Sequence, residues 1–386
     1  MSFIPYATQT IEEEDLAAVR QVLTSDWLTQ GPAVPAFESA FAAVHGVMYA
    51  VAVSNATAGL HLACVALGVG PGKVVWTTPN SFVASANCAR YCGSDVDFVD
   101  IDPITRNMSV QALAQKLETA KMSGRLPCVV IPVHFSGLPC DLREMRQLAD
   151  EYGFAIIADA SHAVGATYEG APVAQAYADV SVFSFHPVKI ITTGEGGLLA
   201  TQSAELAAKL QLLRSHGITR EPAEMEKPPE GPWCYEQQLL GFNYRLTDIQ
   251  AVLGHSQLSR LGAFQQKRER LAARYPGLLR GLPLKLPAQP ADRTCSWHLY
   301  VVEVEDGAPA TRAEVYARLR AANIGVNVHY TPIHLQPYYR RLGFTDGMFP
   351  AAEAYGRRAL SIPLYPLLDE SQQDRVAGSL REVLAR

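Results

Sequence analysis

A single lysine stands where an apolar segment ends and a glycine-rich turn follows. Residues 180–185 are mostly apolar, Lys189 comes shortly after them, and Gly194, Gly196 and Gly197 close the turn. A lysine that forms a Schiff base must be partly desolvated, held by a short segment and able to lose its proton. This placement meets those needs, although a lone lysine after a strand is most often a solvated surface residue.

A carboxylate closes a second apolar segment. Asp159 follows Ile156, Ile157 and Ala158, where an unpaired buried charge would be costly. Such a carboxylate can pair with a ligand cation, for example the pyridinium nitrogen of pyridoxal phosphate. A helix N-cap is the structural alternative, and this segment taken alone favours the cap.

Small residues lead from a third segment into a helix. The run Ser54-Asn-Ala-Thr-Ala-Gly59 follows residues 49–53. The first N–H groups of a helix suit a phosphate, but an ordinary capped helix explains the same residues equally well. The run is neither a Walker loop nor a G-x-G-x-x-G fingerprint. An aromatic ring, Phe82, follows the next apolar segment at 74–77.

Together, these four features meet the needs of pyridoxal phosphate, which are a phosphate grip, ring stacking, a pyridinium partner and a Schiff-base lysine. Each feature follows a separate predicted strand, and the carboxyl ends of parallel strands meet at one edge of a sheet. The combination therefore favours a cofactor site over the four separate structural explanations.

Short apolar strands alternate with helical stretches in the first two thirds of the chain. This alternation requires crossover connections, so it predicts an open, mostly parallel α/β sheet covered by helices. The predicted strands are 49–53, 74–77, 96–100, 128–133, 155–158, 180–185 and 198–201.

Both ends of the chain carry further elements. We predict a capping box that starts a helix at Thr10, a turn over 29–32 and a proline-rich loop over 221–232. The other predictions are helices at 35–44, 247–275, 312–322 and 369–386 and strands at 299–305 and 324–330. They indicate a large domain over 1–250, with an N-terminal arm over about 1–30 near the small domain, and a small α+β domain over 251–386.

Composition excludes several classes of protein. With 386 residues, 48% of them hydrophobic and 18% charged, the chain can bury a core and is neither disordered nor fibrous. A net charge of −5 argues against binding nucleic acid. We see no signal-peptide pattern, no membrane-length apolar run and no zinc spacing among seven cysteines. We therefore expect a cytoplasmic protein with reduced thiols, no metal, and neither nucleic acid nor membrane as partner.

Three segments carry a resemblance to a known family. They are Ser-Asn-Ala-Thr-Ala-Gly-Leu-His-Leu at 54–62, Asp-Ala-Ser-His-Ala at 159–163 and Ser-Phe-His-Pro-Val-Lys-Ile-Ile-Thr-Thr-Gly-Glu-Gly-Gly at 184–197. The chain resembles the DegT/DnrJ/EryC1/StrS sugar aminotransferases over nearly its whole length, from residue 27 to residue 364. That resemblance implies a fold-type I pyridoxal phosphate enzyme of the aspartate aminotransferase superfamily, with a seven-stranded, mostly parallel sheet.

The resemblance also implies roles for individual residues. Lys189 would hold the cofactor as the internal aldimine and move a proton, Asp159 would pair with the pyridine nitrogen, and Phe82 would stack on the ring. The phosphate would be held by Ala56, Thr57 and Ser184. His162 would lie by the ring oxygen or support Asp159. Asn243 would reach a phosphate across a subunit interface, which makes a homodimer part of the active site.

Within the family, residues 185–189 and 328–339 are similar to a subgroup of the pseudaminic-acid pathway. It aminates C4 of UDP-linked 4-keto-6-deoxy-acetamido sugars. The implied reaction is ping-pong, with L-glutamate as donor and UDP-4-amino-4,6-dideoxy-N-acetyl-β-L-altrosamine as product. Candidates for contacts with the UDP-keto-sugar are Thr29, Arg245, His329, Tyr330 and His334. For the two histidines, a satisfied polar strand end is an almost equal explanation.

Three alternatives remain open at this point. A dehydratase of the same family would carry His in place of Lys189, so the lysine favours transamination. An aminotransferase for another nucleotide-linked keto sugar, such as 4-amino-arabinose for lipid A, is compatible with the cofactor residues. A regulatory or binding protein without catalysis is disfavoured because Lys189, Asp159 and Ser184 are intact.

Overall fold

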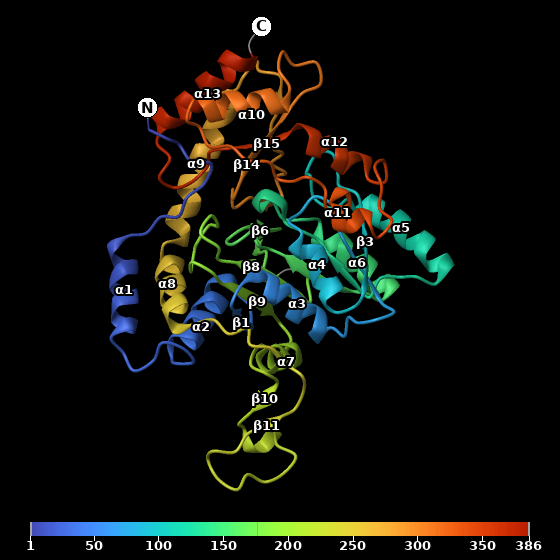
Figure 1. Cartoon of the computed structure of the whole chain (residues 1–386), viewed down its shortest axis with the longest axis vertical. Helices are drawn as coiled ribbons and strands as arrows, with labels where there is room; N and C mark the ends of the chain where they lie inside the picture. Colours follow the sequence, from blue (N-terminus) through green and yellow to red (C-terminus); the bar gives the residue numbers. More distant parts are fainter. Residues whose placement is uncertain (1, 176, 385–386) are drawn as a thin grey trace.

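The structure, a computed structural model, describes residues 2–175 and 177–384. Within these residues, seven strands form one large sheet in the order β1-β9-β8-β5-β4-β2-β3 (Figure 1). Its strands are β1 (Tyr49–Val53), β2 (Val74–Thr77), β3 (Asp95–Phe98), β4 (Val129–Ile131), β5 (Ala155–Asp159), β8 (Val180–Ser184) and β9 (Gly197–Thr201). Neighbouring strands from β3 through β8 run parallel, whereas β9 is antiparallel to both β1 and β8. The predicted mostly parallel α/β sheet is confirmed.

Helices cover both faces of this sheet and bury an apolar cluster on each. One cluster contains Phe37, Phe41 and Leu117, and the other contains Leu60 and Leu213. Because both faces are covered, strands such as β8 are buried along their whole length. The helices of this part are α1 (Glu13–Leu23), α2 (Ala33–His45), α3 (Ala56–Ala66), α4 (Ala84–Tyr91), α5 (Val110–Ser123), α6 (Leu142–Tyr152) and α7 (Ala204–Arg214).

The first helix begins later than the sequence suggested. Its N-cap is Glu12, whose N–H donates to Asp15 Oδ2 at 3.0 Å, so the predicted capping box at Thr10 is wrong. The buried Asp15 carboxylate also accepts from Ser256 and Gln257 at 2.7 Å. These long-range bonds fix the start of α1 against α8 (Asp248–Ser259).

A smaller antiparallel sheet of β12 (Leu284–Lys285), β14 (Tyr300–Val304) and β15 (Ala359–Ile362) packs with the C-terminal helices (Figure 1). The helices that share an apolar cluster with this sheet are α9 (Leu261–Leu278), α10 (Arg312–Ala321) and α13 (Glu370–Leu384), whereas buried residues of α11 (Pro337–Arg340) and α12 (Pro350–Arg358) join an apolar cluster of the large sheet. The single helix predicted over 247–275 is divided at Arg260 into α8 and α9. The proposed division at about residue 250 stays a prediction.

The strand predicted over 324–330 is wrong. This segment forms only isolated bridges, from Ile324 to Ile4 and from Asn327 to Ser361. Gly325 N–H donates to the Ile4 carbonyl at 2.6 Å, because the N-terminal arm takes the place of a neighbouring strand. The first residues of the chain are thereby attached beside this segment.

Short elements complete the described chain. The pair β10 (Ile218–Thr219) and β11 (Glu236–Gln237), with the proline-rich loop between them, projects from the molecule as a narrow arm (Figure 1). The remaining elements are β6 (Thr167–Tyr168), β7 (Ala171–Pro172), β13 (Arg293–Thr294) and the 3-10 turns Phe135–Gly137, Pro222–Glu224 and Ile333–Leu335.

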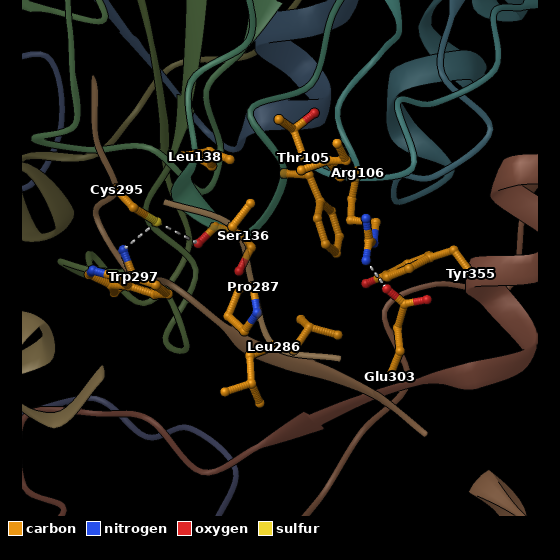
Figure 2. A pocket seen from close by; sticks show the side chains of 14 residues that line it. Thr105, Arg106, Ser136, Leu138, Leu286, Pro287, Cys295, Trp297, Glu303 and Tyr355 are labelled. Carbon is orange, nitrogen blue, oxygen red and sulfur yellow. Dashed lines mark hydrogen bonds and ion pairs between the residues drawn. The ribbon is translucent and has the colours of Figure 1, made fainter. Parts of the chain in front are cut away.

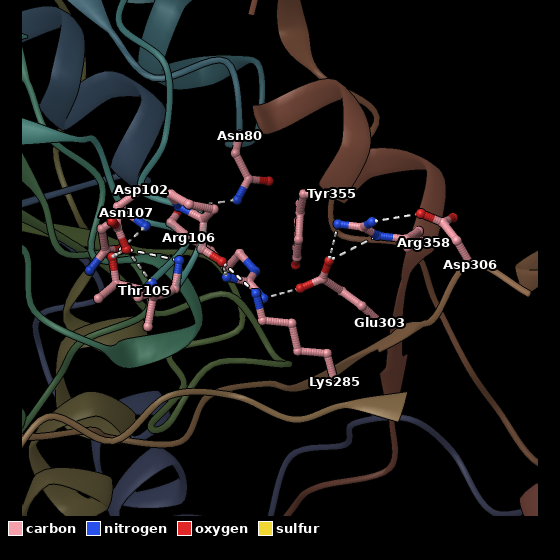
Figure 3. A network of polar contacts seen from close by, with 12 residues as sticks. Asn80, Asp102, Thr105, Arg106, Asn107, Lys285, Glu303, Asp306, Tyr355 and Arg358 are labelled. Carbon is pink, nitrogen blue, oxygen red and sulfur yellow. Dashed lines mark hydrogen bonds and ion pairs between the residues drawn. The ribbon is translucent and has the colours of Figure 1, made fainter. Parts of the chain in front are cut away.

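A buried polar network joins the loop after β3 to the small sheet (Figure 3). Arg106 donates to Glu303 of β14, and the other Glu303 oxygen accepts from Arg358 at 3.0 and 3.2 Å. Beside this network, Arg106, Trp297 and neighbouring side chains line a small cavity of about 30 Å³ (Figure 2). The hydroxyl of Tyr355 donates to the His329 carbonyl at 2.9 Å. The two sheets are therefore linked by buried charge as well as by apolar packing.

All seven cysteines lie in the described residues and are free thiols. In that part of the chain, no group of three or more His, Cys, Asp and Glu side chains is arranged to hold a metal ion. Nor does any helix there combine the length and apolar character required to cross a membrane.

Candidate active site

A cavity of about 740 Å³ opens where β5 and β8 end. Asp159 is the last residue of β5, Ser184 is the last residue of β8, and Asn55 follows β1 as the N-cap of α3. The cavity thus lies at the sheet edge at which the sequence placed the chemistry. The predicted residues that line it are Ala56, Thr57, Phe82, Asp159, His162, Ser184, Lys189, His329 and Tyr330.

Lys189 lies in the turn between β8 and β9. Its N–H donates to the His186 carbonyl at 2.9 Å, which fixes the backbone at the lysine. Burial lowers the pKa of the Lys189 amine to about 8, against the attraction of Asp159, which raises it. The amine therefore reaches its neutral, nucleophilic form at a lower pH than a solvated lysine does.

Asp159 is held on both of its carboxylate oxygens. Oδ1 accepts the Ser161 N–H at 3.1 Å, and Oδ2 accepts the Ser85 hydroxyl at 2.6 Å. Only 5% of Asp159 is exposed. The N-cap alternative is excluded, because the residues after Asp159 form turns and the next regular element is the short strand β6.

The N-terminus of α3 forms an anion-binding wall. Asn55 Oδ1 accepts from Ala58 N at 2.9 Å, and the N–H groups of Ala56 and Thr57 precede the first helical hydrogen bonds. A Cβ at Gly197 would lie 2.5 Å from the Asn55 carbonyl carbon, so only glycine lets β9 pass this turn. Backbone N–H groups, a helix dipole and the nearby Ser184 hydroxyl suit a phosphate group.

His162 forms a directed hydrogen-bond chain on another wall. The backbone N–H of Ser136 can only donate, and it lies 3.2 Å from His162 Nδ1. The ring proton is therefore on Nε2, which donates to Tyr330 Oη at 3.3 Å. Burial, with a smaller effect of the Lys189 charge, lowers the pKa of His162 well below its ordinary value. The imidazole is thus neutral.

Phe82 supplies an aromatic wall to the cavity. Its side chain is 60% exposed although it is large and apolar. An uncovered ring facing a cavity suits a planar aromatic ligand. Together with Asp159, Lys189 and the amides of Ala56 and Thr57, this wall fits pyridoxal phosphate: each part of the group meets a residue type that can hold it.

His329 also lines the cavity, and its Nδ1 lies 2.7 Å from Ser361 Oγ. Burial, with a smaller effect of Lys189, lowers the pKa of His329 to about 3. His334 differs, because it is fully buried away from the cavity and its Nε2 lies 3.0 Å from Glu353 Oε1. The prediction of His334 as a substrate contact is therefore wrong, since its ring is covered and paired in the core.

Three further predicted residues lie outside this cavity in the single chain. Thr29 pairs with Thr247 in an isolated bridge, and the exposed Asn243 pairs in the same way with Ser215. Arg245 Nη1 donates to Ser215 Oγ at 3.2 Å and lines a separate pocket of about 240 Å³. Within the part of the chain that the structure describes, none of the three lines the cavity that contains Lys189.

Sequence reasoning missed several side chains that line the cavity, among them Tyr6 and His298. The His298 ring centroid lies 4.4 Å from that of His162, and the Tyr6 ring centroid lies 5.7 Å from that of His329. A histidine directly before the predicted strand at 299–305 was an available signal for His298. Tyr6 gave none, because its placement depends on the docking of the N-terminal arm.

The sequence matches the DegT/DnrJ/EryC1/StrS aminotransferase family over residues 9–381. The chain belongs to this family. The spore coat polysaccharide biosynthesis protein SpsC of Bacillus subtilis (strain 168) is 39% identical over 386 residues, which cover 99% of this chain and 97% of SpsC. The predicted family and enzyme class are confirmed, so the chain is a pyridoxal phosphate-dependent sugar aminotransferase.

Solved structures agree with this membership. Helicobacter pylori PseC, an aminotransferase involved in the biosynthesis of pseudoaminic acid, superposes with a TM-score of 0.91 at 28% identity, covering 99% of each chain. The putative sugar aminotransferase Spr1654 of Streptococcus pneumoniae in its PLP form gives a TM-score of 0.90 at 28% identity, covering 99% of this chain and 98% of Spr1654. The predicted fold-type I architecture is confirmed, and the PLP form of this relative supports the same cofactor here.

Proposed function

We propose that this aminotransferase moves an amino group from L-glutamate to C4 of a UDP-linked 4-keto-6-deoxy-N-acetyl sugar. The product would be UDP-4-amino-4,6-dideoxy-N-acetyl-β-L-altrosamine. The observation that carries the chemistry is the meeting of Lys189, Asp159 and the N-terminus of α3 in one cavity. The match to PseC, described as acting in pseudoaminic acid biosynthesis, supports the choice of sugar.

Lys189 performs two tasks in this proposal. When bound, pyridoxal phosphate supplies an electron sink for the charge that develops at the reacting carbon. The Lys189 amine would anchor the cofactor, and its neutral form would take the proton from Cα of the donor and pass it to C4′ of the cofactor. A pKa of about 8 suits both tasks, because neutral and protonated amine coexist near pH 7–8.

The other residues bind and orient. The Asp159 carboxylate pairs with the ring nitrogen, and Phe82 lies against the ring. The amides of Ala56 and Thr57 hold the phosphate together with the Ser184 hydroxyl. His162, neutral and a donor at Nε2, lies where it can bond the ring oxygen in place of Tyr330.

Charge balance supports a homodimer. Among the described residues that line the cavity, Lys189 is the one Lys or Arg side chain, whereas glutamate brings two carboxylates and the cofactor a phosphate. The projecting arm exposes 70% of Trp233, and Leu240, shortly after the arm, is 83% exposed; this apolar surface suits contact with a second copy. Asn243 is exposed beside this arm. We therefore propose that Asn243, together with the Lys or Arg side chains that the cavity lacks, reaches the cavity of a partner subunit.

Subunit complementation tests the shared site. Lys189→Ala and Asn243→Ala proteins would each lose most activity. Mixing them after reversible dissociation would form heterodimers, in which one of the two sites combines an intact Lys189 from one subunit with an intact Asn243 from the other. Recovery of up to about a quarter of wild-type activity is expected from random pairing. A monomeric, fully active protein would overturn the dimer proposal.

A two-stage assay tests the reaction. The holoenzyme is first mixed with L-glutamate, and its visible absorbance and the release of 2-oxoglutarate are followed. The keto sugar is then added, and the product is identified by mass spectrometry and NMR. Lys189→Ala should abolish the turnover of both stages, with Lys267→Ala, on the exposed side of α9, as the matched control. An unreactive wild-type protein that binds pyridoxal phosphate would overturn the choice of donor.

A second candidate is amination of a different nucleotide-linked keto sugar. It is favoured by the 39% identity to SpsC, which exceeds the 28% identity to PseC. Both candidates share the first stage and differ in the second. A panel of keto sugars offered to the glutamate-treated enzyme separates them, because only the proper acceptor regenerates the original absorbance at a useful rate.

A further inference from the structure

Two serine hydroxyls form a buried relay that ends on Asp159. Ser85 Oγ donates to Asp159 Oδ2 at 2.6 Å and lies 2.8 Å from Ser81 Oγ. Because the single proton of Ser85 goes to the carboxylate, the hydrogen bond between the two serines is donated by Ser81. Ser85 has no exposed surface, and Ser81 is only 3% exposed. The relay therefore runs in one direction, toward Asp159, and its inner hydroxyl, that of Ser85, is fully buried.

The relay completes the support of the Asp159 side chain. The Asp159 N–H donates to the Pro132 carbonyl at 2.9 Å, and its carbonyl accepts from His134 at 3.0 Å, so the backbone is fixed by β4 and the turn after it. Ser161 occupies Oδ1 at 3.1 Å. Ser85 is the donor to Oδ2, and 2.6 Å is typical of a charge-assisted O–H···O⁻ bond.

The relay also links Asp159 to the aromatic wall. Ser81 directly precedes Phe82, and the Ser85 N–H donates to the Phe82 carbonyl at 3.3 Å. The start of α4 thus sets both the ring of Phe82 and the rotamer of Asp159. A planar ligand with a cationic nitrogen would meet these two groups together.

We propose that Ser85 is a positioning residue, supported by Ser81, that keeps the Asp159 carboxylate oriented toward the ring nitrogen of pyridoxal phosphate. The inference rests on the proposed function, in which Asp159 pairs with that nitrogen. Without the Ser85 hydroxyl, Oδ2 loses its buried donor, and the carboxylate turns toward another donor or admits a water. Its pairing with the ring nitrogen then weakens.

Two readouts test this role apart from turnover: the dissociation constant of pyridoxal phosphate and the ¹⁵N chemical shift of ring-labelled cofactor. In Ser85→Ala, we expect about tenfold weaker binding, the size of a lost hydrogen bond to a charged group. The ring nitrogen should also lose its proton at a lower pH than in the wild type. Ser85→Thr, which keeps the hydroxyl, should restore much of both.

Ser94→Ala is the matched control. Ser94 is equally buried and donates to the Lys73 and Asp95 carbonyls beyond the far end of α4. Removal of its hydroxyl should leave the ¹⁵N shift at the wild-type value. If Ser85→Ala does not fold, Ser81→Ala, which removes only the outer hydroxyl, should show a smaller change in the same direction.

The possible results are distinct. A folded Ser85→Ala protein with wild-type cofactor affinity and ¹⁵N shift would overturn the inference. If Ser85→Ala does not fold, the same result in Ser81→Ala would overturn it. So would an equal change in Ser94→Ala. If instead Asp159→Asn leaves the ring nitrogen as it is in the wild type, the proposed role of Asp159 fails first, and the inference fails with it.

Discussion

Tyr330 Oη lies 3.3 Å from Nε2 of His162, and the opposite nitrogen of that ring faces the backbone N–H of Ser136 at 3.2 Å. One imidazole thus joins a loop of the large sheet, represented by Ser136, to the segment that carries His329 and Tyr330. Because the backbone N–H of Ser136 can only donate, the tautomer of His162 is set by the backbone. The cavity wall presents a neutral N–H donor rather than an imidazolium.

His162 should therefore remain neutral as the pH falls through 6.5, because burial lowers its pKa well below that value. Two-bond ¹H–¹⁵N NMR spectra of the apoprotein should show one His162 signal with the proton on Nε2. The His162→Gln variant assigns the signal, and Tyr330→Phe should leave the tautomer unchanged, since Ser136 sets it. An imidazolium pattern at pH 6 would contradict the prediction.

Replacement of Lys189 by Met should stabilise the apoprotein in a pH-dependent way. The folded-state pKa is about 8 and the ordinary value is 10.5, so between them the unfolded chain binds a proton that the folded chain does not. The free energy of unfolding of the wild type therefore rises with pH across this window. The cost of burying the ammonium is fully present below about pH 8 and disappears above about pH 10.5.

Urea unfolding of wild type and Lys189→Met at pH 7 and pH 10, without cofactor, measures this difference. We expect the variant to be more stable at pH 7, with an advantage that shrinks toward pH 10. Lys267→Met, at an exposed position on α9, is the matched control for exchanging an ammonium for a thioether. An advantage that grows with pH would have the wrong sign and would refute the burial argument.

Glu303 should be the most sensitive residue of the link between the two sheets. Its carboxylate is 3% exposed and lies between the guanidinium groups of Arg106 and Arg358 (Figure 3). Glu303→Ala leaves those charges without their shared partner, which costs about 3–5 kcal/mol in comparable buried pairs. Asp306→Ala removes an 88% exposed partner of Arg358 and should cost no more than about 1 kcal/mol. Denaturant midpoints of the two variants test the contrast, and similar losses would contradict it.

The sequence was most informative where a functional residue directly follows a strand. Lys189, Asp159, Ala56 and Thr57 were placed at one sheet edge in this way, because an apolar run predicts its own carboxyl end, and all four line the same cavity. The antiparallel direction of β9 could not be predicted, since either direction suits a buried apolar strand. Ser85 could not be found either, because its partner is 74 positions away in the sequence.

Two predictions were wrong: His334 as a substrate contact, and a strand over residues 324–330. The similarity of residues 328–339 to a subgroup of the family placed His334 in the cleft, but its partner is Glu353, on a helix that the sequence pattern did not reveal. Residues 324–330 alternate like a strand, yet Ile4 of the arm takes the hydrogen bond at Gly325. Both errors come from contacts between distant segments, which local patterns do not encode.

Gly197→Ala should disrupt the anion-binding wall that the N-terminus of α3 forms. The added Cβ would lie 2.5 Å from the Asn55 carbonyl carbon and 2.6 Å from Ala56 N, and backbone atoms cannot rotate away as a side chain can. Either the start of α3 moves or the pairing of Gly197 with Val53 opens. In both cases the amides of Ala56 and Thr57 lose their alignment, and pyridoxal phosphate should bind at least about tenfold more weakly, as expected for the loss of charge-assisted hydrogen bonds.

Gly262→Ala is the control for this substitution, because a Cβ added at this position on α9 would have no neighbouring atom within 4 Å. It should leave cofactor affinity unchanged, so fluorescence titration of both variants with pyridoxal phosphate isolates the effect of the close approach. Pyridoxal without its phosphate should lose little affinity in Gly197→Ala, since the damage is confined to the anion-binding wall. An equal loss for both ligands would show instead that the substitution disturbs the whole cavity.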